Sequence, residues 1–261
     1  MHDDPYRAAA DAYDLFAAPY RAAQQAALAE ALPHFQPEVG AILDIGAGPG
    51  TAAVEILERL PEAHVLALEP SATMRALLLG RIAERTELHP RITVRPEAFF
   101  DAELPQQLGG AIMLGVLGHF DVMARKAVFA ELARRLAPGA GVLTDLQLPQ
   151  TPEPVPPHEF TAAQIGDVEY RGIAEAKPID DEQMRWRMIY LTLAGERVLT
   201  EEWAEHTFNH PDPDRLKAEA LDAGFDIKPT RTQMSRPLHS VRTFCESSCC
   251  PRSRAGRLVR S

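Results

Sequence analysis

The sequence is poor in cysteine and in aromatic residues, and it has no long hydrophobic run. It contains three cysteines in 261 residues, and 7% of its residues are aromatic. The longest apolar stretch, residues 111–117, is much shorter than the roughly 20 residues that a membrane-spanning helix requires, so we expect no membrane partner. We also expect no metal site, because only His239 lies near the cysteines, which are Cys245, Cys249 and Cys250.

The chain also lacks a secretory signal pattern and an excess of positive charge. Residues 1–4 contain neither the basic nor the apolar segment of a signal peptide, which favours a cytoplasmic protein. The net charge is −10, from 27 basic and 37 acidic residues. Because an acidic protein repels phosphate backbones, we expect no nucleic acid partner.

A glycine-rich turn follows the clearest strand pattern in the chain. Residues 41–45 are apolar except for Asp44, and a helical apolar pattern begins after Thr51. Glycines allow a left-handed backbone and a close approach to a ligand, and a helix N-terminus offers free N–H groups. Strand, turn and helix together predict a nucleotide-type loop. Its alternating glycines are Gly46, Gly48 and Gly50.

The spacing of this turn distinguishes two kinds of nucleotide. A dinucleotide-binding turn has the pattern G-x-G-x-x-G, whereas Thr51 occupies the position of its third glycine. Asp44 would repel a pyrophosphate but attract a cation. The pattern D-x-G-x-G-x-G resembles motif I of the class I S-adenosylmethionine (SAM) methyltransferases, whose cofactor carries an ammonium and a sulfonium. The resemblance implies that SAM is bound by Asp44, Gly46, Ala47, Gly48 and Gly50.

A second acidic residue ends the next apolar strand pattern. Residues 64–69 end in Glu69, which lies 25 residues after Asp44, and an acid at this position accepts hydrogen bonds from ribose hydroxyls. The run from Glu69 to Met74 resembles the second motif of the same family, which implies SAM contacts from Glu69, Pro70 and Met74. A solvated turn for Glu69 and ordinary core packing for Met74 are the alternatives.

Two further segments complete the implied cofactor site. A third strand is expected at 91–95, and the family has an acid, a small residue and an apolar residue after it, where they meet the adenine. A fourth strand is expected at 111–114; the family usually opens it with an Asp, but Gly109 and Gly110 stand there. The cofactor contacts implied by these segments are Glu97, Ala98, Phe99 and Leu114.

The order of the patterns predicts an α/β fold. Residues 39–149 alternate apolar strands with helices, which indicates a parallel sheet covered on both faces. A proline-rich connector at 149–157 precedes a period-two pattern over 160–210. We expect a doubly wound, Rossmann-like, mostly parallel seven-stranded sheet with an inserted antiparallel β subdomain and an N-terminal helical cap.

These patterns divide the chain into five segments. The last two strands of the core sheet are expected at 225–232 and 238–244, and the Ser- and Arg-rich tail has no apolar periodicity. The expected segments are an N-terminal helical cap at 1–38, a SAM-binding core at 39–149, an inserted antiparallel β lid at 150–212, a C-terminal helix with two strands at 213–244, and a disordered tail at 245–261.

The tyrosines and tryptophans all lie outside residues 39–149. They fall in the two segments that would cover the carboxyl edge of the sheet, where open α/β sheets bind ligands, and they suggest a pocket for a small, partly apolar acceptor. Each could instead only pack a cap on the core. Tyr13 with Asp14 resembles the Tyr-Asp pair of the family's N-terminal segment, which closes over the cofactor. The expected acceptor contacts are Tyr20, Tyr170, Trp186 and Tyr190.

The resemblance implies a SAM-dependent methyltransferase acting on an O, N or C atom of a small molecule. A general base is needed only for a protonated acceptor, and His119, just beyond the fourth strand, is the best-placed residue. A structural role for His119 stays open, as do base roles for His158, His206 and His210. A homodimer through the insert is a further hypothesis. A non-catalytic SAM-binding protein and a nucleotide-dependent dehydrogenase are the alternative functions.

Overall fold

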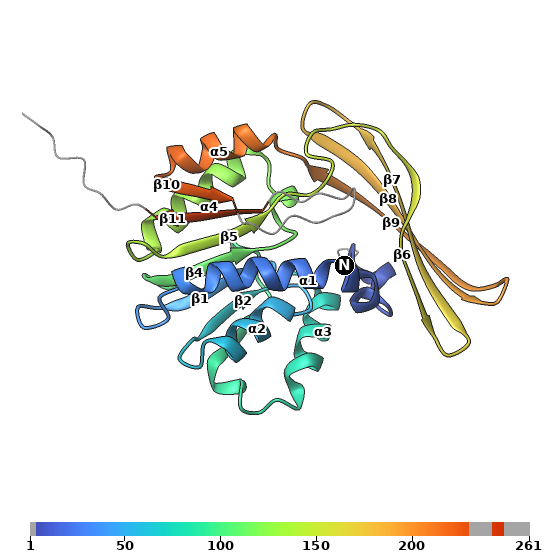
Figure 1. Ribbon diagram of the computed structural model, residues 1–261, viewed down its shortest axis with the longest axis horizontal. Coiled ribbons are helices and arrows are strands. Elements are labelled where there is room, and N and C mark those ends of the chain that lie inside the picture. The colour runs from blue at the N-terminus through green and yellow to red at the C-terminus, as the bar shows by residue number, and fades with distance from the viewer. Residues whose placement is uncertain (1–3, 230–241, 248–261) are drawn as a thin grey trace, which may run out of the picture.

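The chain forms two β-sheets that lie side by side, as the computed structural model shows for residues 4–229 and 242–247 (Figure 1). The main sheet has the strand order β10-β11-β5-β4-β1-β2-β3, and the second sheet has the order β6-β7-β8-β9. Strands β3, β2, β1, β4 and β5 run parallel, and β11 and β10 continue the sheet antiparallel beyond β5.

The main-sheet strands are β1 (Ala41–Ile45), β2 (Val65–Leu68), β3 (Ile92–Arg95), β4 (Leu108–Met113), β5 (Gly141–Asp145), β10 (Phe225–Pro229) and β11 (Arg242–Ser247). The helices are α1 (Tyr13–Ala31), α2 (Thr51–Arg59), α3 (Ala72–Ala83), α4 (Val122–Arg135) and α5 (Pro213–Asp222), with short 3₁₀ turns η1 (Arg7–Ala9), η2 (Leu32–His34), η3 (His89–Arg91) and η4 (Leu117–His119).

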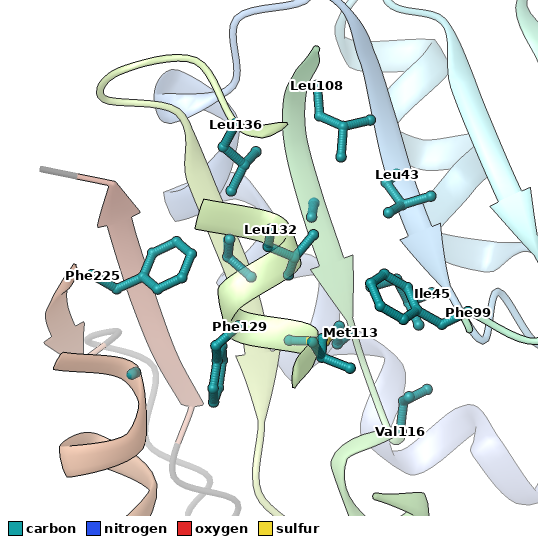
Figure 2. Packing of buried hydrophobic residues seen from close by; sticks show 14 of the residues in the cluster. Leu43, Ile45, Phe99, Leu108, Met113, Val116, Phe129, Leu132, Leu136 and Phe225 are labelled. Atoms are coloured by element: carbon teal, nitrogen blue, oxygen red, sulfur yellow. The ribbon is translucent and has the colours of Figure 1, made fainter. Parts of the chain in front are cut away.

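The parallel strands are buried on both faces because their apolar residues are consecutive. Leu43 belongs to the core under α4 and α5, whereas its neighbour Ile42 belongs to the core under α1, α2 and α3. Figure 2 shows Phe129 and Leu132 of α4 on the side of the sheet that carries Met113. This layering confirms the predicted parallel, Rossmann-like α/β sheet.

The second sheet is inserted between β5 and α5. Its strands are β6 (Val155–Ile165), β7 (Val168–Pro178), β8 (Gln183–Ala194) and β9 (Arg197–Asn209), paired antiparallel throughout. The period-two pattern of β8 buries Met184 and Trp186 together with Ala174 and Ala176 of β7. A separate antiparallel sheet, as the period-two pattern predicts, is therefore present.

Several element boundaries differ from the sequence-based expectation. Strand β4 begins at Leu108 rather than at 111, because Leu108 and Gly110 already pair with β1. Position 109 has no room for a side chain, since a Cβ on Gly109 would lie 2.3 Å from the Gln36 carbonyl oxygen. Helix α4 ends at Arg135, and the next residue, Leu136, forms a parallel bridge with Leu108.

The last boundary concerns the C-terminal strands. Strand β10 ends at Pro229, and β11 spans 242–247, so it includes three residues of the expected tail. The rest of the expected tail, 248–261, and the expected strand residues 230–232 and 238–241 lie outside the described residues. Within the described ranges, no helix has the length and apolar character to span a membrane.

Candidate functional site

Two adjoining cavities lie at the carboxyl ends of the parallel strands. The larger, of about 640 Å³, lies over the turn after β1, and we call it the glycine-turn cavity. The smaller, of about 340 Å³, lies between α1 and the second sheet, and we call it the aromatic cavity. Both are lined by Tyr6, Tyr13, Ala17, Gln24 and Gly115.

The three glycines of the turn all have left-handed backbones but different surroundings. A Cβ on Gly46 (φ +64°) would lie 2.5 Å from Val116 Cγ2, and one on Gly50 (φ +77°) would lie 2.5 Å from Leu78 Cγ. A Cβ on Gly48 (φ +56°) would meet nothing closer than 4.0 Å. Gly46 and Gly50 are thus required for packing, whereas Gly48 leaves its backbone open to the cavity. Gly50 precedes α2 and lines neither cavity.

Glu69, at the end of β2, ties this turn to the start of α3. Its Oε2 accepts a hydrogen bond from Gly48 N at 2.7 Å, and its Oε1 accepts one from Ser71 N at 2.8 Å. The residue is 5% exposed, so it is not a solvated turn residue. Burial raises the pKa of the Glu69 carboxyl, while the two backbone N–H groups favour its charged form.

Asp44, in β1, presents an unsatisfied buried carboxylate. It is 2% exposed, and its Oδ2 has no hydrogen-bond partner in the described part of the chain. Burial, reinforced by the charge of Glu69, raises the pKa of Asp44 to about 8. A buried acid without a partner is costly, and a cation bound in the cavity that it lines would relieve that cost.

The N-terminal segment crosses the glycine-turn cavity and is attached to α3. Asp4 Oδ2 accepts from Thr73 N at 2.9 Å and from Ser71 Oγ at 2.8 Å, so Asp4 caps the first turn of α3 from a distant part of the chain. Asp14 pairs with Arg81 at 2.6 Å. Sequence reasoning missed Asp4, because a cap from outside the helix leaves no local signal.

His119 and Tyr6 meet where the two cavities adjoin. Tyr6 Oη lies 3.0 Å from His119 Nε2, and Tyr6 lines both cavities whereas His119 lines the glycine-turn cavity. Burial, with a contribution from His206, lowers the pKa of His119, so its imidazole is neutral near pH 7. Burial raises the pKa of Tyr6 above its usual range. A neutral imidazole next to a phenol can accept a proton, whereas Tyr6 keeps its own.

The remaining residues expected at the cofactor surround the same cavity. Glu97 lines it, but its carboxylate pairs with Arg95, and Met74 is buried in its wall. Tyr13 lines both cavities. The other expected residues that line the glycine-turn cavity are Ala47, Pro70, Ala98, Phe99 and Leu114.

The aromatic cavity collects three of the four expected acceptor residues. Tyr20, Trp186 and Tyr190 line it, and Tyr190 stacks on Phe16 with centroids 5.1 Å apart. Tyr170 lines neither cavity. The period-two pattern that includes Trp186 and Tyr190 could also have identified Met188 between them. Polar and aromatic lining residues that sequence reasoning did not assign to the acceptor include Asp145, Gln147, His158, Phe160, His206 and Phe208.

The fold and the site together define a class I SAM-dependent methyltransferase. Residues 42–139 match the sequence model of the family described as "Methyltransferase domain", and that family uses SAM. The glycine turn, the unpaired Asp44 oxygen and the acidic lining of the glycine-turn cavity fit this cationic cofactor. Residues 42–139 therefore form a methyltransferase domain, and the chain is a SAM-dependent methyltransferase. No curated protein matches it in sequence.

Solved structures share its architecture. CcbJ methyltransferase from Streptomyces caelestis is 15% identical with a TM-score of 0.71, covering 94% of this chain and 97% of its own. DesVI from Streptomyces venezuelae is 18% identical with a TM-score of 0.69, covering 90% and 97%. SAM-bound CalS10, an amino pentose methyltransferase from Micromonospora echinaspora involved in calicheamicin biosynthesis, is 15% identical with a TM-score of 0.69, covering 88% and 95%. At these identities the likeness shows the fold.

Proposed function

We propose that the protein methylates an O, N or C atom of a small molecule that binds in the aromatic cavity. The observation that carries this proposal is the junction of two cavities of different chemistry, one acidic and glycine-rich, the other aromatic, which share Tyr6, Tyr13 and Gly115. A cofactor and an acceptor in these cavities would meet at their junction. The amino pentose substrate of CalS10 supports a small acceptor here.

The residues of the glycine-turn cavity would hold SAM by charge and by backbone contacts. When bound, SAM supplies a methyl group already activated on a sulfonium, so the protein mainly positions the reactants and excludes water. Asp44 would face the positive charge of the cofactor. Glu69 would accept from ribose hydroxyls with the lone pairs that Gly48 N and Ser71 N leave free.

His119 would act as the general base when the acceptor atom carries a proton. Its neutral imidazole lies at the junction of the cavities, and Tyr6 holds its Nε2 edge. Because the pKa of Tyr6 is raised, this phenol orients His119 and does not take the proton itself. An acceptor that is already deprotonated would need no base.

The N-terminal helical segment and the insert would form the cap and the lid of this site. Tyr6 and residues of α1 line both cavities, Ala9 of η1 lines the aromatic cavity, and β6 to β9 form a wall of the aromatic cavity. The competing role for the insert is a homodimer interface, since Trp203 of β9 is 56% exposed. The variants Tyr190→Ala, in the cavity wall, and Trp203→Ala, on the other face of the sheet, separate the two when kinetics and a sizing column are combined. A lid predicts that Tyr190→Ala loses acceptor saturation at unchanged size, whereas an interface predicts that Trp203→Ala shifts to monomer with normal kinetics.

A screen of acceptor libraries with methyl-labelled SAM tests the proposed function. We expect label transfer to a small molecule and loss of transfer in His119→Gln if the acceptor atom is protonated. Calorimetry in parallel should show micromolar binding of SAM and of its demethylated product, and negligible binding of NAD. Binding of SAM without transfer to any acceptor would contradict the proposed turnover, and tighter binding of NAD would contradict the cofactor assignment.

A further inference from the structure

Trp186 forms part of the wall of the aromatic cavity, and its indole is tied to a buried histidine. Its side chain is 8% exposed, and its Nε1 donates a hydrogen bond to His210 Nε2 at 3.0 Å. The two rings are nearly parallel, with an interplanar angle of 22° and centroids 5.9 Å apart. His210 follows β9 directly and is 2% exposed. The indole therefore has its single polar group occupied inside the protein.

The hydrogen bonds of His210 determine its protonation. An indole N–H can only donate, so Nε2 must accept; the other ring nitrogen, Nδ1, lies 2.7 Å from the Pro149 carbonyl oxygen, which can only accept. The ring is therefore neutral with its proton on Nδ1. Burial, which lowers the pKa of His210, favours the same state. One imidazole thus connects Trp186 to the segment that follows β5.

The backbone of His210 is fixed as well. Its N–H donates to the Glu182 carbonyl oxygen at 2.7 Å, and the preceding Asn209 donates from Nδ2 to the Gly118 carbonyl oxygen at 3.1 Å. Gly118 lies in η4, the turn that carries His119. The imidazole is therefore held against both the main sheet and the second sheet, and it can impose an orientation on the indole.

We propose that His210 is a positioning residue that turns the Trp186 indole so that the acceptor meets its ring and not its N–H. This inference rests on the proposed function, in which the aromatic cavity holds the acceptor. The subsite at Trp186 then takes an apolar, aromatic or cationic group, which an aromatic surface binds well, and offers no hydrogen bond to a hydroxyl. The acceptor should therefore carry a ring or an alkyl group on this side.

Three substitutions of His210 separate its two side-chain hydrogen bonds. His210→Gln places an amide oxygen where Nε2 accepts from Trp186. His210→Asn keeps a donor for the Pro149 carbonyl but does not reach the indole. His210→Phe fills the space and forms neither bond. The first variant is the conservative rescue, and the second is its matched control.

Kinetics with the acceptor found in the screen provide the first readout. We expect His210→Asn and His210→Phe to raise the KM for the acceptor about tenfold or more, with kcat and SAM affinity within about threefold, since only acceptor binding loses a positioned contact. His210→Gln should stay within about threefold of the parent enzyme in all three quantities. Equal KM values for the Asn and Gln variants would overturn the positioning role.

Fluorescence of Trp186 provides a readout that does not need turnover. Trp203 is the other tryptophan, so the three variants are made in a Trp203→Phe background. We expect the Asn and Phe variants to shift the Trp186 emission maximum and the Gln variant to leave it unchanged. If no acceptor is ever turned over, the proposed function fails, and the fluorescence series still decides whether His210 holds the indole. Emission unchanged in all three variants would overturn the inference.

Discussion

Asp44 is expected to make the unliganded protein less stable as the pH rises. Its pKa is raised from 3.8 to about 8 by burial and by Glu69, so between these values the folded chain keeps a proton that the unfolded chain has lost. The stabilising contribution is therefore complete below about pH 4 and lost as the pH approaches 8. Asp44→Asn should be more stable than the parent at pH 7.5, as measured by urea unfolding at pH 5 and pH 7.5.

The same substitution should weaken cofactor binding. A neutral amide cannot attract the cationic cofactor, so we expect at least about tenfold weaker SAM binding at pH 7.5 and a smaller rise of affinity with pH than in the parent, measured by calorimetry. A variant that loses stability at pH 7.5 but keeps its SAM affinity would contradict the role of Asp44 on both counts.

Glu69 is expected to affect both cofactor affinity and the order of the turn. Glu69→Gln is neutral and retains one acceptor oxygen, so both N–H groups lose their charged partner, and one of them, of Gly48 or of Ser71, loses its acceptor altogether. Hydrogen bonds to charged groups contribute about 1.5–3 kcal/mol, so we expect SAM affinity to fall at least about tenfold with a modest drop in melting temperature. Glu62→Gln is the matched control, because Glu62 is exposed before β2. Equal SAM affinities for the two variants would show that Glu69 has no part in binding.

The turn after β1 combines a packing role and a binding role in neighbouring glycines. A side chain in the left-handed region costs about 1–2 kcal/mol at either position. At Gly46 the new methyl would also overlap Val116, whereas at Gly48 it enters open space at the cavity wall. We expect Gly46→Ala to lower the free energy of unfolding by more than 2 kcal/mol, and Gly48→Ala to fold but to bind SAM at least about tenfold more weakly. Denaturation and calorimetry on both variants check this, and the reverse ranking in either measurement would contradict it.

Local signals explain which elements the sequence could predict. Strands β1 and β2 are runs of mostly apolar, buried residues; Asp44 is the last but one residue of β1, and Glu69 directly follows β2. The glycines of the turn adopt a left-handed backbone that other residues avoid. The period-two pattern of β8 likewise indicates a strand that packs one of its faces in a core. These features are encoded within a few neighbouring residues, so sequence reasoning placed them correctly.

The missed features depend on residues far apart in the chain. Asp4 caps α3 across 69 positions, and position 109 of β4 requires glycine because the Gln36 backbone packs against it. Tyr6 gains its importance only from the fold that brings it to His119. No pattern in a single window contains such pairs. Tyr170 illustrates the opposite case: as an aromatic residue of the insert it was expected at the acceptor, but it lines neither cavity.

At the scale of the whole molecule, a buried ion network joins the second sheet to the main fold. Arg125 of α4 is fully buried; its Nε donates to Glu219 Oε2 of α5 at 2.8 Å, and its Nη1 pairs with Glu182 in the turn between β7 and β8. Arg215 also pairs with Glu182, at 3.0 Å. The backbone carbonyl of Glu182 receives the N–H of His210. The wall of the aromatic cavity and the core are therefore connected through one guanidinium.

Replacing Arg125 should destabilise the protein strongly and also loosen the acceptor site. Arg125→Met leaves the buried Glu219 with only the long 3.8 Å contact to Arg215 among the described residues, and breaking a buried pair of this kind costs about 3–5 kcal/mol. At about 2–4 °C per kcal/mol for a chain of this size, the melting temperature should fall by roughly 6–20 °C. Arg134→Met is the matched control in the same helix, because Arg134 is exposed and pairs with Glu131 on the surface, and it should change stability by less than about 0.5 kcal/mol. Arg125→Met with Glu219→Leu should recover part of the loss, since the double variant no longer buries the carboxylate of α5 that Arg125 had paired.

If Arg125→Met melts within 2 °C of Arg134→Met, the guanidinium does not hold the two sheets together, and the second sheet must be anchored by its apolar contacts alone.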